Sequence, residues 1–148
     1  VNVSGEQDYQ DEFNQELVET GMSLAENLNR GNVHLVAAYP SAPINMAIDL
    51  PEFNTSGYEN GIRGQHLINM KALRQKFGIS EDHTHVREGF PEEVIPDVAK
   101  EIEAELVILG TVGRTGLSAA LLGNTAEHVI SKLSCNLLGI KPSKKDDQ

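Results

Sequence analysis

The chain has 148 residues and a hydrophobic content of 39%, which suits one domain with a single packed core. Its formal net charge of −10 argues against nucleic acid and anionic membrane surfaces as partners, because both repel an acidic chain that lacks a basic face. The basic cluster of Lys141, Lys144 and Lys145 is offset by Asp146 and Asp147, so no such face is expected.

The first residues, the apolar runs and the single cysteine bear on the cellular compartment that we expect for the chain. No apolar run approaches the ~20 residues of a membrane span, and the first residues have no features of a signal peptide. Cys135 has no internal disulfide partner, so we expect a packed, inert thiol in a reducing cytoplasm. Val1-Asn2-Val3 has the character of the end of a strand, which predicts a truncated first strand in a piece of a longer chain.

The first half of the chain alternates between helix and strand patterns. Residues Ser4 to Asp11 are polar and predict a loop, and the helix after them ends at a glycine stop, Gly31. Val33 to Tyr39 is short and apolar, as in a buried parallel strand. The apolar stripe of the helix recurs with helical spacing at Phe13, Leu17, Gly21, Leu24 and Leu28.

A long connection follows, residues 40–58, with three prolines and an apolar stretch from Ile44 to Phe53. Long loops in compact domains are usually functional or disordered, and this one is too apolar for simple disorder. Two interpretations stay open: a flap over the ligand-facing edge of the sheet, or a packed excursion. A second helix is predicted from Tyr58 to Phe77, with Gly78 as its C-terminal cap.

The second half continues the alternation. A strand is predicted at His83 to Glu88, a helix from Pro91, a strand at Leu106 to Leu109, a helix at Asn124 to Leu133 and a last strand at Asn136 to Ile140. Residues 143–148 form a charged tail. The order favours an α/β fold with a parallel sheet and helices on both faces, and ligands then bind at the carboxyl ends of the strands. The core faces of these helices are Ile62, His66, Met70, Leu73 and Phe77, then Val94, Ile95, Val98, Ala99 and Ile102, then Ala126, Val129, Ile130 and Leu133.

The loop after the fourth strand carries the main functional signal. Gly110, Gly113 and Gly116 lie between an apolar strand and a helix N-terminus, an arrangement that can hold an anion. It is not a Walker P-loop, which needs a lysine after its last glycine. It is not a dinucleotide fingerprint either, because the first loop has only Gly5.

Gly110-Thr111-Val112-Gly113, nine residues and then Gly123-Asn124 resemble the nucleotide-binding signature of the universal stress proteins, G-x-x-G, nine residues, G-[ST]. The segments LPEF, IRGQHL, MKALRQKFGI, PEEVIPD and LGTVGRTG extend the resemblance over the whole chain, closest to the second domain of tandem members. The resemblance implies an adenine nucleotide alpha hydrolase-like sheet of five parallel strands in the order 3-2-1-4-5. It also implies a cytoplasmic stress-response role, binding of ATP (with Mg²⁺) or AMP, and domain pairing through Leu137 to Ile140, as a homodimer or an intramolecular pseudo-dimer.

Two positions depart from the family. Asn124 replaces the serine or threonine of the signature, and Asn2 replaces the acidic residue that ends the first strand, so we expect weak nucleotide binding or none. Asn124 with Glu127 also fits a capping box, and Arg114 is either a phosphate partner or a surface arginine. The implied nucleotide-binding residues are Asn2, Ala38, Gly110, Thr111, Gly113, Arg114, Gly123, Asn124 and Thr125.

Other chemistry is weaker. His83 and His85 share one face of a strand at a spacing that can bind zinc, but no third ligand is evident, so we expect exposed histidines and no metal. No carboxylate pair or nucleophile is positioned for catalysis, so no enzyme is expected. Three functions remain open: a nucleotide-responsive binding domain, a scaffold that keeps the glycine turn only for folding, and a carrier of apolar small molecules or lipid that uses the loop from Ile44 to Phe53.

Overall fold

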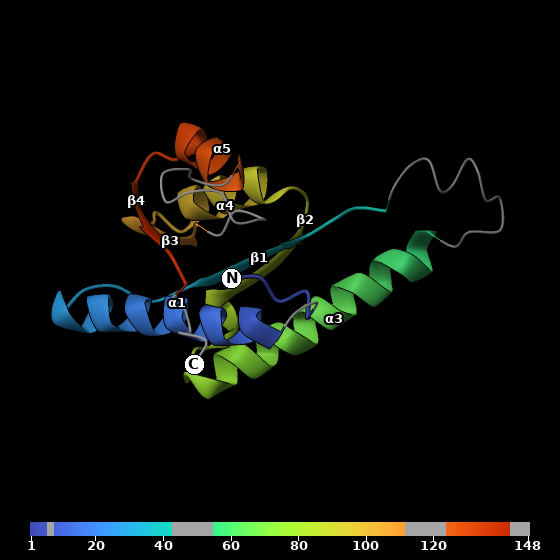
Figure 1. The fold of residues 1–148 in the computed structure, drawn as a ribbon, viewed down its shortest axis with the longest axis horizontal. Coiled ribbons are helices and arrows are strands. Elements are labelled where there is room, and N and C mark those ends of the chain that lie inside the picture. Colours follow the sequence, from blue (N-terminus) through green and yellow to red (C-terminus); the bar gives the residue numbers. More distant parts are fainter. Residues whose placement is uncertain (6–7, 43–54, 112–123, 143–148) are drawn as a thin grey trace, which may run out of the picture.

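The computed structural model describes residues 1–5, 8–42, 55–111 and 124–142, and these residues alternate between helices and strands as predicted (Figure 1). None of the helices described is long and apolar enough to cross a membrane. The elements are α1 (Asp8–Asn27), β1 (Leu35–Tyr39), α3 (Thr55–Lys76), the short 3₁₀ helix η1 (Glu81–His83), β2 (Thr84–Glu88), α4 (Pro91–Glu101), β3 (Leu106–Gly110), α5 (Asn124–Lys132) and β4 (Asn136–Ile140).

The strands form two separate parallel pairs in the described part of the chain. β1 pairs with β2, with Leu35 opposite Thr84, and β3 pairs with β4, with Leu106 opposite Asn136. The prediction of an α/β fold with parallel strands is therefore confirmed. Residues 1–3 are not a strand, so the described residues contain four strands and the five-strand order stays a prediction.

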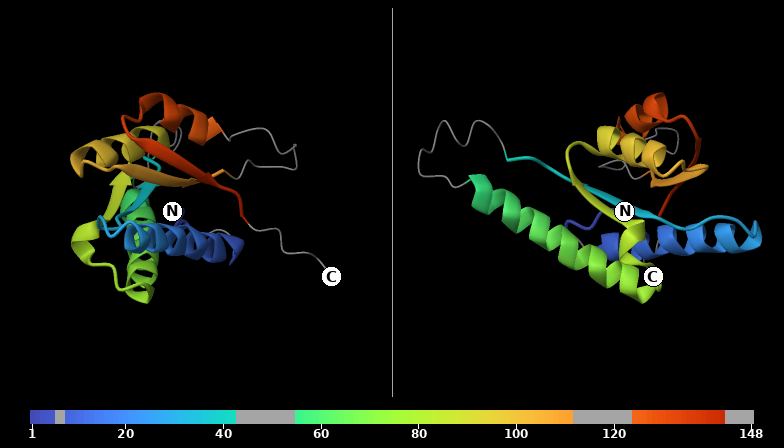
Figure 2. Two further views of the ribbon diagram at one scale, coloured as in Figure 1. Left: turned by 90° about the vertical axis from the view of Figure 1, so that its left-hand side faces the viewer. Right: turned by 180° about the vertical axis from the view of Figure 1, so that it is seen from behind.

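Helices cover both faces of the β1–β2 pair. α1 and α3 lie on one side of the strands, and α4 and α5 lie together on the other (Figures 1 and 2). Alternation along β1 explains this, because successive side chains of a strand point to opposite faces. Leu35 and Ala37 are buried in the cluster that contains Met70 of α3, whereas Val36 lies on the face lined by Val98 of α4.

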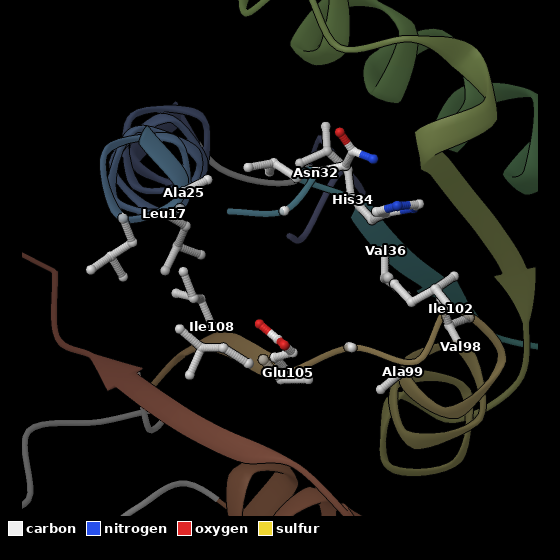
Figure 3. A pocket seen from close by; sticks show the side chains of 18 of the residues that line it. Leu17, Ala25, Asn32, His34, Val36, Val98, Ala99, Ile102, Glu105 and Ile108 are labelled. Carbon is white, nitrogen blue, oxygen red and sulfur yellow. The ribbon is translucent and has the colours of Figure 1, made fainter. Parts of the chain in front are cut away.

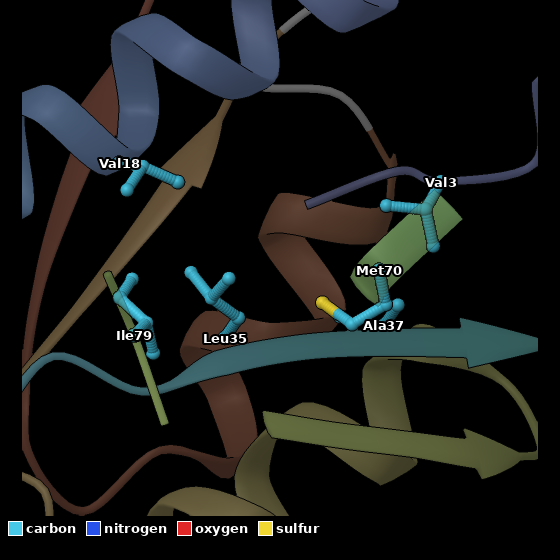
Figure 4. Close-up of a cluster of buried hydrophobic side chains, with 6 residues drawn as sticks. All are labelled: Val3, Val18, Leu35, Ala37, Met70 and Ile79. Atoms are coloured by element: carbon cyan, nitrogen blue, oxygen red, sulfur yellow. The ribbon is translucent and has the colours of Figure 1, made fainter. Parts of the chain in front are cut away.

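The main hydrophobic cluster lies between α1, α3 and β1 (Figure 4). Met70 is 2% exposed, which explains the predicted helical stripe of α3. Gly78 follows α3 with a φ of +66°, a left-handed conformation that glycine adopts without steric cost, so the predicted cap is confirmed. The six buried members are Val3, Val18, Leu35, Ala37, Met70 and Ile79.

Several predicted boundaries and faces were wrong. α1 begins at Asp8, inside the segment predicted as a loop, and β1 begins at Leu35 instead of Val33. Leu28 is 64% exposed because α1 ends one residue before it. Ile130 is 43% exposed, because the stripe that packs on α4 runs through the buried Ala126 and Val129.

Two regions of interest lie outside the described residues. They are the predicted flap, within 43–54, and most of the glycine loop, 112–123. The two interpretations of the flap therefore remain predictions. β3 ends at Gly110 and α5 begins at Asn124, so the strand and the helix on either side of the glycine loop are confirmed.

Candidate functional site

Two consecutive residues of α1 contact two of the predicted site residues. Asn14, which is 3% exposed, accepts a hydrogen bond from the Asn2 backbone N–H (2.9 Å) and donates one from its side chain to the Asn2 carbonyl (2.6 Å). The ring of Phe13 lies against Gly110 at the end of β3. The first turns of α1 therefore bring the N-terminal segment and the start of the glycine loop to one place.

The N-terminal segment is held from two helices. In addition to the α1 contact, the Asn69 side chain on α3 donates to the Val3 carbonyl (2.8 Å). The exposed Asn2 side chain accepts a hydrogen bond from the Ser4 backbone N–H (3.1 Å) in a local turn. Its amide oxygen is thus already engaged, and its NH₂ group is the part that can donate to a ligand.

Gly110 has a packing role that does not require a ligand. A Cβ atom at this position would lie 2.9 Å from Phe13 Cζ, closer than real Cβ contacts. A larger residue fits at this position only if Phe13 moves, because overlapping atoms in a packed interior strain the side chains around them. The space beside Gly110 is therefore filled by Phe13 of α1.

Thr111 also has a structural partner. Its backbone N–H and its hydroxyl both donate to the Ile140 carbonyl, at 2.9 and 3.2 Å. These bonds extend the β3–β4 pairing by one residue. Its methyl group lies over Gly139, where a Cβ atom would lie 2.7 Å from it, so the hydroxyl is held away from free rotation toward a ligand.

The remaining predicted site residues are less constrained. Ala38 is half-buried in β1, opposite Arg87 of β2, and Thr125 is exposed in the first turn of α5. The Asn124 backbone begins α5, with Glu127 in the same turn, and the capping box that these two residues suggest stays a prediction. Gly113, Arg114, Gly123 and the Asn124 side chain lie outside the described residues.

A groove of about 610 Å³ separates the two strand pairs (Figure 3). Its walls are largely apolar and come from α1, β1, α4 and β3. Val1 lines this groove, and its backbone nitrogen donates to the Val36 carbonyl (3.0 Å). Residues that line the groove include Leu17, Gly21, Val36, Val98, Ile102 and Ile108.

Three histidines meet at the start of β1 and β2, a contact that no pattern along the sequence indicates. His34 Nδ1 lies 3.1 Å from His85 Nε2, and the ring centroids of His34 and His83 are 4.3 Å apart. All three are half-buried, so the expectation of exposed strand histidines was wrong, and His83 belongs to η1. Among the residues described, no three His, Cys, Asp or Glu side chains form a group that could hold a metal ion.

The parallel register explains the cluster. Leu35 pairs with Thr84, so the residues immediately before them, His34 and His83, also lie opposite each other. His85 lies opposite Val36, and His34 is on the same face as Val36, because alternate residues of an extended chain share a face. This contact could be predicted only from the pairing of β1 with β2, because His34 and His83 are far apart in the sequence.

The sequence and the fold together define a class of protein. A profile of the Universal stress protein family matches residues 9–141, and the chain belongs to this family. It is 97% identical over 147 residues to the universal stress protein E homolog of Haemophilus influenzae, covering 99% of this chain and 48% of that relative. It is 60% identical over 144 residues to universal stress protein E of Escherichia coli K12, covering 97% of this chain and 46% of that one. The chain thus spans about half the length of these relatives.

Solved structures support the same fold. A functionally unknown protein from Pseudomonas aeruginosa PAO1 matches with a TM-score of 0.74 and 27% identity, over 96% of this chain and 45% of that chain. A universal stress protein from Lactobacillus plantarum matches with a TM-score of 0.57 and 23% identity, over 85% of this chain and 88% of that chain. The second likeness concerns the fold alone.

Proposed function

We propose that this chain is a stress-response domain that binds an adenine nucleotide weakly and acts through binding, without turnover. The observation that carries the proposal is the contact of α1 with both Asn2 and Gly110. It gathers the end of the N-terminal segment and the start of the glycine loop, both of which the family resemblance assigns to the nucleotide.

Two of the predicted site residues already form hydrogen bonds within the chain, which favours weak nucleotide binding. The Asn2 amide oxygen accepts from Ser4, and the Thr111 hydroxyl donates to Ile140. A ligand hydroxyl or phosphate must compete with these bonds, and a net hydrogen bond contributes only about 1 kcal/mol. Asn2 also lacks the charge of the carboxylate that the family usually has there, and charge-assisted bonds are roughly twice as strong as neutral ones.

Equilibrium binding tests the proposal. ATP, ADP and AMP, each with Mg²⁺, are titrated into the intact protein by isothermal calorimetry. We expect saturable binding in the high micromolar to millimolar range for at least one of the three. No saturable signal at millimolar nucleotide contradicts nucleotide binding, and release of phosphate at a steady rate contradicts a role without turnover.

A second candidate is a scaffold half, and the edge of β4 favours it. Within the described residues β4 pairs only with β3, and Leu138 on it is 36% exposed. An edge strand with an exposed apolar side chain is a natural surface for pairing with a second domain. In this case the glycine turn serves the packing of Phe13, and no ligand is needed for function.

The groove between the strand pairs bears on the third candidate, an apolar ligand carrier. Its long walls include β1 and β3 edges that have no strand partner in the described residues, so an occupant must offer backbone hydrogen bonds. A lipid tail offers none, whereas a further parallel strand offers one for every free group. We therefore propose that a further parallel strand, which continues into Val1, lies in the groove between β1 and β3. With this strand in place, the strand order is 3-2-1-4-5. Native mass spectrometry distinguishes the two, because a co-purified hydrophobe would contradict strand occupancy.

A further inference from the structure

The histidine cluster adds side-chain contacts to the backbone pairing that joins the start of β1 to β2. His34 precedes the first ladder residue of β1, and its contact with His85 Nε2 at 3.1 Å crosses to the neighbouring strand. The rings of His34 and His85 stack with centroids 5.4 Å apart, and the His83 ring lies 4.3 Å from His34 on the same face. Three titratable rings thus share one small, half-buried space.

The chemistry of the contact limits its protonation. A hydrogen bond between two imidazole nitrogens needs one N–H and one lone pair, so at least one of the two rings must be neutral. When both rings carry a proton, two N–H groups point at each other and two positive charges lie within a few ångströms. The contact then becomes repulsive, and His83 adds a third charge beside it if it is also protonated.

The charges around the cluster act in both directions: Arg87 adds to the repulsion at His85, and Glu101 opposes it. From β2, Arg87 lies on the same side, and its guanidinium forms a two-point ion pair with Glu101 of α4 (2.7 and 2.6 Å). Glu101 thereby acts on both Arg87 and His85, and Asp97 acts on Arg87. The remaining charged groups nearby are Glu81 and Asp82 of η1, next to His83 in the chain, and Arg30, Glu103 and Glu105, which line the same groove as His34.

The pKa directions agree with the geometry. Burial, followed by the charges of His83 and His85, lowers the pKa of His34. Burial lowers the pKa of His85, Arg87 lowers it further, and Glu101 opposes the change. Both rings bind protons less readily when folded, so the unfolded chain takes up protons first. Stability is full above about pH 6.5, the ordinary histidine value, and is lost as the pH falls through the lower folded values.

We propose that His34, His83 and His85 form an acid-sensitive clasp, which reinforces the pairing of the start of β1 with β2 until the cluster takes up a second proton. Release frees the segment before β1, where His34 also lines the groove between the strand pairs. A fall in pH would therefore loosen the domain at this end while α4 and α5 stay packed. The clasp makes no use of the nucleotide site, so it stands or falls separately from the proposed function.

The test is a histidine-resolved NMR titration of the intact protein from pH 8 to pH 5. We expect the midpoints of His34 and His85 to lie below about 6.5. In His85→Gln, which keeps a polar side chain but removes the charge, the His34 midpoint should rise. The matched control is His128→Gln, an exposed histidine on α5, which should leave the His34 midpoint unchanged.

A second readout keeps the proposal falsifiable if one variant folds poorly. Amide hydrogen exchange of the unsubstituted protein at pH 7.5 and 5.5, corrected for the intrinsic rate, should show protection lost in residues 34–36 and 84–86 but kept in α4. A His34 midpoint that is unchanged in His85→Gln, or protection lost equally in all strands, overturns the clasp.

Discussion

The ring of Phe13 on α1 fills the space where a side chain on Gly110 would lie, so a helix residue and a glycine-loop residue are packed as a pair. We predict that Gly110→Ala lowers the free energy of unfolding by about 1–3 kcal/mol, because the added Cβ would lie 2.9 Å from Phe13 Cζ. Chemical denaturation measures the change. A second substitution, Phe13→Leu, should recover part of the loss by making room.

A matched control comes from a glycine with space around it. A Cβ on Gly61, in the interior of α3, meets no atom within 4 Å. Gly61→Ala should therefore raise the free energy of unfolding, by about 0.5–1 kcal/mol, through helix propensity. If Gly110→Ala behaves like Gly61→Ala, the packing role of Gly110 is wrong.

Asn2→Asp should raise affinity for an adenine nucleotide about 3- to 10-fold. A carboxylate can keep the bond from Ser4 N–H on one oxygen and accept a ligand hydroxyl on the other, with charge assistance. Calorimetry with AMP measures the change. Asn60→Asp adds the same charge at an exposed position of α3 and should leave the affinity unaltered. Equal effects of the two substitutions would show that only net charge matters.

The helices and the parallel strands could be predicted because their periodicity is local. The stripe of α3 through His66 and Met70 follows directly from spacing, and both side chains are buried. The errors lie where tertiary context decides: Leu28 fits the stripe of α1 but lies beyond its last turn. Residues 8–11 are polar and still helical. They form the first turn of α1, next to Phe13 and Asn14, whose tertiary contacts hold this end of the helix in place.

The candidate site was only partly predictable, for a different reason. The family resemblance implies Gly110, Thr111 and Asn2, but not what each already contacts within the chain. Those partners, Phe13, Ile140 and Ser4, come from other elements or from a local turn. The contact of His34 with His85 likewise depends on strand register, which no spacing along the sequence reveals.

The proposed pairing of domains through β4 predicts that Leu138→Lys weakens self-association. The side chain is 36% exposed on an edge strand, where a lysine charge opposes strand addition. Analytical ultracentrifugation should show the self-association constant fall by at least tenfold, while Ile68→Lys, at a 65% exposed position on α3, leaves it unchanged. An equal loss in both variants places the pairing surface elsewhere.

The most direct test of the central claim is a ¹H–¹⁵N NMR titration of the intact protein with AMP, and with ATP and Mg²⁺. Weak nucleotide binding where α1 joins the N-terminal segment to β3 predicts saturable shifts of the Ser4, Thr111 and Thr125 amides at millimolar nucleotide. The amides of Ile68 and its neighbours on the exposed side of α3 should not move. Shifts that fail to saturate, or that are confined to the groove around Val36 and Ile108, would contradict the account.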